Sequence, residues 1–393
     1  MNILKPLRKV LRALPEDHDP SKIWLAIGRA LHEIGYDSAA LPAVEYALEL
    51  APSSPVTRRL LRRISGRDVS LPENIEAIVG KALAEAMGQP ETELYCSASE
   101  QVMSGNGANT KYVAKHLFSG PFEKVIFEKC FYTTKFLPRE ALVYQSIDKI
   151  PNGRFYRFPQ IYGQQSYGDT YSVFMEAVET PPTTANPQTR FLIRAKALGE
   201  FAGRCRDITD LDFLNVPAPD HKIKIDRCDV FESVSSKQEL NLFKSNLEKL
   251  VAYREELLHT IPTSLVKGDA QPANLIMDEN KYIVFIDNGR VGRGPIGEDL
   301  ASLLWGILIK DEKLARTRES ECLSVFHKYA SELTSCSIKE IRQGYGCQLV
   351  RLLYLRLIHK YSSETKATPD QLRTIFKKAE FIQKVALSAF EAN

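Results

Sequence analysis

The chain has 393 residues, 44% hydrophobic and 26% charged, which is typical of globular proteins rather than of disordered or fibrous ones. Its formal net charge is only +3, and no patch of basic residues interleaved with aromatics appears beyond the N-terminal helices, so a nucleic-acid partner is not expected. No apolar run approaches the ~18 residues that a membrane-spanning helix needs. The seven cysteines are scattered and odd in number, which argues against a disulfide framework and for a reducing, cytoplasmic location.

Residues 1–68 are predicted to form a small all-helical segment. The stretch SKIWLAIGRALHEIGYDSAALPAVEYALELAPSSP resembles one tetratricopeptide repeat, a helical hairpin of about 34 residues. The matching positions are Trp24, Ile27, Gly28, Leu31, Ala40, Val44, Ala47 and Pro52. Two interpretations remain equal: residues 1–67 dock a protein partner, or they form a helical cap on the main domain. Four arginines lie on one face of a following helix: Arg58, Arg59, Arg62 and Arg63. This face could contact an acidic partner, phosphate or a membrane surface, although a solvated face is the simpler interpretation.

The rest of the chain alternates between helical and β-like patterns. A helix at 70–88 is followed by three β-like runs, a short helix at 138–150, and a hairpin at 161–179. Beyond it the pattern is mainly helical, interrupted by a small β patch at 264–287. This order predicts an α+β protein with a small β-rich lobe and a larger, mainly helical lobe. The predicted domains are 1–68, 69–178 and 179–393.

Polar residues at the ends of the apolar runs in the β patch carry the strongest chemical signal. Asp269 and Asn274 lie five residues apart in one loop, and Asp287 ends the apolar strand Ile283–Ile286. Carboxylate and amide oxygens held by such a strand suit Mg²⁺, which takes one or two protein oxygens and fills its shell with phosphate and water. Asp269 could accept a proton from a substrate hydroxyl. Asp299 opens the next helix.

This pattern resembles the catalytic core of the aminoglycoside phosphotransferase and choline kinase family, which shares the protein-kinase fold. The family's His-Gly-Asp, Asn, Ile-Asp and Asp-Leu-Ala elements stand here as Lys267-Gly268-Asp269, Asn274, Ile286-Asp287 and Asp299-Leu300-Ala301. The resemblance implies that Asp269 is the catalytic base, that Asn274 and Asp287 hold Mg²⁺, and that Asp299 braces the loop. Lys267 replaces the family histidine, so we expect it either to hold the loop or to sit beside Asp269 and weaken it as a base.

The resemblance also implies a nucleotide site in the preceding segment. Lys129, central in KVIFEKCFY, would grip the ATP phosphates, and Glu140, in the first turn of the following helix, would hold that lysine. Backbone groups would contribute the remaining contacts. Those of Gly105 and Gly107 would lie around the phosphates, and those of Glu176 and Val178 would contact the adenine. Arg290 and Arg293 could meet phosphate or an anionic substrate, although a solvated loop is the simpler interpretation.

The sequence therefore predicts an enzyme that uses ATP and Mg²⁺ to phosphorylate a hydroxyl of a small molecule or glycan. Two alternatives stay open. The first is a kinase-like binding module with weak catalysis that acts through its N-terminal helices. The second is a protein kinase or an AMP-transferring enzyme on the same scaffold.

Overall fold

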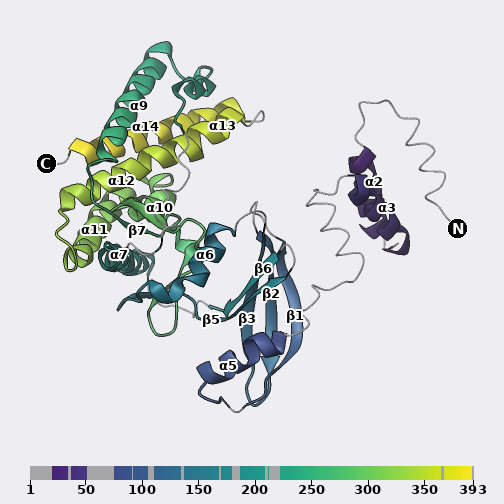
Figure 1. Ribbon diagram of the computed structural model, residues 1–393. Coiled ribbons are helices and arrows are strands. Elements are labelled where there is room, and N and C mark those ends of the chain that lie inside the picture. The colour runs from purple at the N-terminus through teal and green to yellow at the C-terminus, as the bar shows by residue number, and fades with distance from the viewer. Residues whose placement is uncertain are drawn as a thin grey trace. The chain divides into compact units, whose positions relative to one another are not determined.

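The computed structural model in Figure 1 describes most of the chain. The described residues are 20–33, 37–50, 75–90, 92–104, 110–133, 137–167, 170–178, 186–208, 211, 222–363 and 367–391. Two compact units emerge, the first comprising Met1–Lys135 with Ile161–Ala177 and the second Phe136–Gln160 with Val178–Asn393. The predicted boundaries near residues 68 and 178 stay a prediction.

No helix within those described ranges is both long and apolar enough to cross a membrane.

The described part of the N-terminal segment is a pair of packed helices, α2 (Pro20–Glu33) and α3 (Asp37–Leu50). Trp24 is buried between them, with its ring edge-on to Tyr46 at 5.3 Å between centroids. A Cβ added to Gly28 would lie 2.3 Å from Val44 Cγ2, so glycine allows the close approach. Pro52 and the four arginines lie outside the described residues. The repeat-like character and the partner of this segment stay predictions.

The first unit contains a five-stranded antiparallel sheet in the order β1-β2-β3-β6-β5. Its strands are β1 (Tyr95–Ser104), β2 (Thr110–Ser119), β3 (Lys124–Tyr132), β5 (Ile161–Tyr167) and β6 (Thr170–Glu176). One face packs on a helical stretch formed by η1 (Glu76–Gly80) and α5 (Lys81–Ala86). Val79 and Leu83 of this stretch share a core with Phe118, Ile126 and Phe174 of the sheet. The hydrophobic alternation of the strands therefore decides which face is covered.

The second unit is mainly helical. Its helices are α6 (Arg139–Gln145), η2 (Ile147–Lys149), α7 (Pro187–Arg204), η3 (Ile225–Phe231), α9 (Lys237–Leu257), η4 (Pro272–Asn274), α10 (Glu298–Leu308), α11 (Glu312–Ser331), α12 (Ile338–Leu352), η5 (Leu353–His359), α13 (Lys360–Ser363) and α14 (Pro369–Glu391). Two small sheets complete it: β10 (Gly292–Pro295) with β7 (Thr263–Val266), and β9 (Ile283–Phe285) between β4 (Tyr156–Arg157) and β8 (Leu275–Met277). One unit built around an antiparallel sheet and one mainly helical unit confirm the predicted two-lobed α+β architecture.

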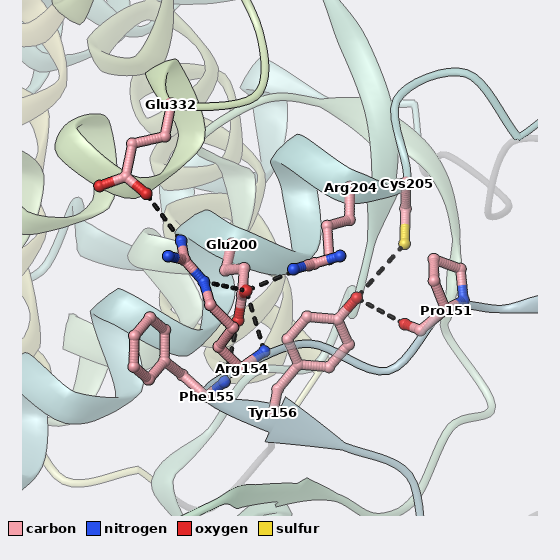
Figure 2. A network of polar contacts seen from close by, with 8 residues as sticks. All are labelled: Pro151, Arg154, Phe155, Tyr156, Glu200, Arg204, Cys205 and Glu332. Carbon is pink, nitrogen blue, oxygen red and sulfur yellow. Dashed lines mark hydrogen bonds and ion pairs between the residues drawn. The ribbon is translucent and has the colours of Figure 1, made fainter.

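A buried glutamate on α7 contacts the turn that leads into β4 (Figure 2), and β4 pairs with β9. Glu200 accepts hydrogen bonds from the backbone N–H groups of Arg154 and Phe155, both at 2.9 Å, and from Arg204 Nε at 3.0 Å. Burial alone would raise the pKa of Glu200, but these hydrogen bonds outweigh it and hold the pKa below its usual value. The turn that leads into β4 is thereby fixed to α7, and β4 supports the strand that precedes Asp287.

We expect Glu200→Gln to lower the free energy of unfolding by roughly 2–4 kcal/mol, because the amide leaves buried donors without a charged acceptor. The matched control is Glu332→Gln. Glu332 is partly exposed and contacts only the outer end of Arg154, so its loss should cost about 0.5 kcal/mol or less. Urea unfolding of both variants measures the difference. Equal effects would contradict the role assigned to Glu200.

Candidate active site around Asp269 and Asp287

Asp299 fixes the backbone of the loop that contains Asp269. Its carboxylate, buried in the first turn of α10, accepts hydrogen bonds from the backbone N–H of Lys267 at 2.7 Å and of Gly268 at 2.8 Å. Gly268 has a φ of 74°, and a Cβ there would lie 2.3 Å from the carbonyl oxygen of Arg290. Glycine is therefore required at this position. Burial raises the pKa of Asp299 to about 6, although the two amide bonds and Lys267 act in the opposite direction.

Lys267 ties this loop to the residue that ends the neighbouring strand. Its side chain is fully buried, and Nζ donates a hydrogen bond to the backbone oxygen of Asp287 at 2.6 Å. Burial lowers the pKa of Lys267, while the negative charges of Asp287 and Asp299 oppose that shift. Asp287 has a φ of 54°, a left-handed conformation that is uncommon outside glycine. The lysine therefore holds the carbonyl of a left-handed residue in place. Which of the two roles expected for Lys267 it has in catalysis stays a prediction.

Asp269 and Asn274 lie together on the surface side of the same loop. The Asn274 amide donates to the backbone oxygen of Asp269 at 3.0 Å and to its Oδ2 at 3.3 Å. Gln271 Nε2 donates to Oδ1 at 2.7 Å, and Arg356 Nη2 lies 3.7 Å from the same oxygen. Gln271 and Arg356 are site residues that sequence reasoning did not identify. Gln271 lies two residues after Asp269, so its position in the loop could have identified it. Nothing in the sequence places Arg356, on η5, beside Asp269.

Glu140 lies against the residue that follows Asp287. Its Oε1 accepts hydrogen bonds from the backbone N–H of Asn288 at 3.2 Å and from the hydroxyl of Tyr144 at 3.1 Å. Asn288 is itself fully buried and donates its amide to the Phe285 carbonyl at 3.0 Å. The glutamate of α6 thus helps to hold the turn after β9, a contact that the sequence did not suggest.

The nucleotide contacts expected of Lys129 and of the four backbone positions stay predictions. Lys129 lies half-buried in β3 of the first unit, with Nζ 5.8 Å from the centroid of the Phe131 ring. Its expected partner Glu140 belongs to the second unit, and Glu176 and Val178 stand on either side of the boundary between the units. Gly105 and Gly107 lie outside the described residues.

The oxygen atoms of this site fit a hard divalent cation better than a transition metal. Asp287 is exposed, and Asn274 turns its amide nitrogen toward Asp269, so its oxygen faces away from that residue. Across the described ranges, no group of three or more His, Cys, Asp or Glu residues is arranged to hold a metal ion. A site with few protein oxygens suits Mg²⁺ with phosphate and water as further ligands.

The model of a family described as "Phosphotransferase enzyme family" matches residues 193–322, about a third of the chain. That stretch contains Asp269, Asn274, Asp287 and Asp299. No curated protein matches the chain. Residues 193–322 are therefore similar to that family of phosphotransferase enzymes.

The chain is also similar to solved structures of low sequence identity. The amicoumacin kinase hAmiN, solved with AMP-PNP, Ca²⁺ and Ami, is 12% identical with a TM-score of 0.49, over 80% of this chain and 96% of that chain. An aminoglycoside phosphotransferase from Alicyclobacillus acidocaldarius is 14% identical with a TM-score of 0.47, over 81% and 96% of the two chains.

We expect Lys267→Met to lower the free energy of unfolding by about 3–5 kcal/mol, because it leaves Asp299 buried without its nearby positive charge. Adding Asp299→Asn should recover part of that loss, since the double variant no longer buries a carboxylate there. Urea unfolding of the wild type, both single variants and the double variant gives the coupling. Strictly additive losses would contradict the charge contact between Lys267 and Asp299.

The raised pKa of Asp299 also predicts how stability depends on pH. The folded value of about 6 lies above the ordinary 3.8, so the folded chain binds this proton more tightly than the unfolded chain. The resulting stabilisation is complete below the ordinary pKa and is lost as the pH rises through the folded pKa, a total of about 3 kcal/mol. Relative to Asp299→Asn, the wild type should therefore lose stability between about pH 4 and 6 in urea unfolding. Parallel pH profiles would contradict this.

Proposed function

We propose that this protein is an ATP- and Mg²⁺-dependent phosphotransferase that moves the γ-phosphoryl group to a hydroxyl of a small molecule or glycan. One observation carries the proposal. The Asp269–Asn274 loop is fixed through Lys267 and Asp299 to the backbone of Asp287, within a segment that the phosphotransferase family model matches. In the proposal Asp269 is the base, and Asn274 and Asp287 supply the oxygen ligands, which are parts that phosphoryl transfer to an alcohol requires.

Asp269 is the group that would accept the proton of the acceptor hydroxyl. Its carboxylate is partly exposed, and Gln271 and Asn274 fix its orientation by hydrogen bonds to different oxygens. A base held in this way contributes mainly by aligning the hydroxyl with the phosphorus, and proton removal adds a smaller effect.

Asn274 and Asp287 would hold Mg²⁺ through one amide and one carboxylate oxygen. When bound, the cation would neutralise charge on the nucleotide phosphates. The left-handed backbone of Asp287 directs its carbonyl to Lys267, and its side chain is exposed. In this proposal Lys267, which was expected either to hold the loop or to weaken Asp269 as a base, acts as a positioning residue. That role favours a working enzyme over a binding module with weak catalysis.

The proposed nucleotide contacts include two side chains, Lys129 and Glu140. Lys129 on β3 would contact the phosphates, and Glu140 would support it in addition to its contacts with Asn288 and Tyr144. The predicted backbone contacts of the nucleotide, at Gly105, Gly107, Glu176 and Val178, belong to the same proposal.

We expect Asp287→Ala to abolish Mg²⁺-dependent ATP turnover, because it removes a cation ligand. Asp269→Asn should lower turnover by roughly 10²–10⁴-fold, the usual contribution of a general base, while nucleotide affinity changes little. Asp370→Asn, a change at an exposed acid of the same unit, is the control and should leave both unchanged. Turnover and nucleotide affinity are measured on the same preparations.

Unchanged turnover in both site variants would contradict the proposal. A thermal shift with ATP that is indifferent to Mg²⁺ would favour the binding-module alternative. Mass analysis of the product separates transfer of a phosphoryl group from transfer of AMP, and a modified protein instead of a small molecule would indicate a protein kinase.

A further inference from the structure

Arg356 covers the carboxylate that the proposed function assigns as the base. Its Nη2 lies 3.7 Å from Asp269 Oδ1, and its guanidinium lies 5.8 Å from the centroid of the Trp305 ring. Arg356 projects from η5, a π-helical turn, and Trp305 lies on α10. The side chains of Arg356 and Asp269 are 30% and 21% exposed, so a ligand can reach both.

The electrostatic surroundings of Arg356 are positive apart from Asp269. Burial lowers the pKa of Arg356, Asp269 opposes that shift, and the positive charge of Arg290 adds to it. Within the described ranges, Asp269 is the only acid paired with Arg356. The nearby buried acids Asp299 and Glu140 are engaged with backbone amides of their own loops.

We propose that the acceptor carries an oxyanion close to its reactive hydroxyl, as a phosphate, sulfate or carboxylate, and that Arg356 binds this group. The inference rests on the proposed function of Asp269. A planar guanidinium matches the geometry of an oxyanion with two parallel hydrogen bonds. An amine-rich acceptor is disfavoured, because its ammonium groups would approach Arg356 and Arg290.

The contact with Asp269 couples acceptor binding to catalysis. Without an acceptor, Arg356 occupies one side of the Asp269 carboxylate. The oxyanion of the acceptor draws Arg356 away. Oδ1 keeps the hydrogen bond from Gln271 and takes the hydroxyl proton on the side that Arg356 has left, as the hydroxyl oxygen bonds to the γ-phosphorus. The bond between that phosphorus and the bridging oxygen breaks, and ADP leaves. Arg356 is thus a specificity-determining residue.

Binding of inorganic phosphate tests the anion site without knowledge of the acceptor. Isothermal titration is made on the full chain at constant ionic strength, with and without excess Mg²⁺ and AMP-PNP, so that phosphate binding at the nucleotide site is recognised. We expect Arg356→Gln to weaken the nucleotide-independent binding at least 10-fold. Asp269→Asn should strengthen it several-fold, because the competing carboxylate is gone. Arg373→Gln, the same charge change at an exposed arginine, should have no effect.

Equal phosphate affinity in the wild type and Arg356→Gln would overturn the proposal. Unchanged or weaker binding in Asp269→Asn would also overturn it, because Arg356 would then not be shared between the carboxylate and the anion. Unfolding midpoints of the variants confirm that each is folded at the temperature of the titration.

Transfer of ³²P from [γ-³²P]ATP tests the charge of the acceptor. Small molecules of a cell extract are separated into anion-exchange-retained, cation-exchange-retained and unretained fractions. Labelled product is expected from the anion-exchange fraction, with KM raised at least 10-fold by Arg356→Gln, largely retained kcat, and partial recovery in Arg356→Lys. Product only from either other fraction would overturn the proposal. Absence of product from every fraction would count against the phosphotransferase itself, while the phosphate titration still decides the role of Arg356.

Discussion

The hydrogen bonds from two successive backbone amides to the buried carboxylate of Asp299 are the constraint on which the rest of the site depends. They fix the chain at Lys267 and Gly268, where the glycine adopts a conformation that other residues rarely take. The direction of the chain from there determines where Asp269 stands. Because Asp299 belongs to the first turn of α10, the loop is positioned by a helix that is buried along most of its length.

The same constraint explains how a lysine can be buried at position 267. A buried ammonium group is costly unless charges and hydrogen bonds compensate it. Here the backbone carbonyl of Asp287 accepts a hydrogen bond from the Lys267 ammonium group. The negative charges of Asp287 and Asp299 offset part of the cost of burying that group. The arrangement links two loops and also holds a left-handed backbone that would otherwise cost of order 1 kcal/mol or more. Precise geometry is obtained at some expense of stability, as the raised pKa of Asp299 also indicates.

Sequence reasoning predicted the parts of this structure that local pattern determines. Hydrophobic alternation gave the strands of the first sheet, and the apolar run before Asp287 gave β9. Contacts between residues far apart in the chain could not be predicted, because the spacing of residues in the sequence does not determine them. Glu200 holds a turn 46 residues before it, Glu140 reaches Asn288, and Arg356 reaches Asp269 from a helix whose own pattern indicates only packing. Each of these partners is decided by tertiary packing rather than by local propensity.

Three aspartates of one site receive different properties from their surroundings. Asp299 is completely buried and bonded to amides, so its oxygens are committed to the backbone. Asp287 gives its backbone oxygen to Lys267, and its carboxylate stays exposed, as a cation ligand needs. Asp269 is intermediate: two amide side chains orient it, and one arginine competes for it. Since the residue type is the same in all three, burial and hydrogen-bond partners alone separate the buried brace from the proposed cation ligand and the proposed base.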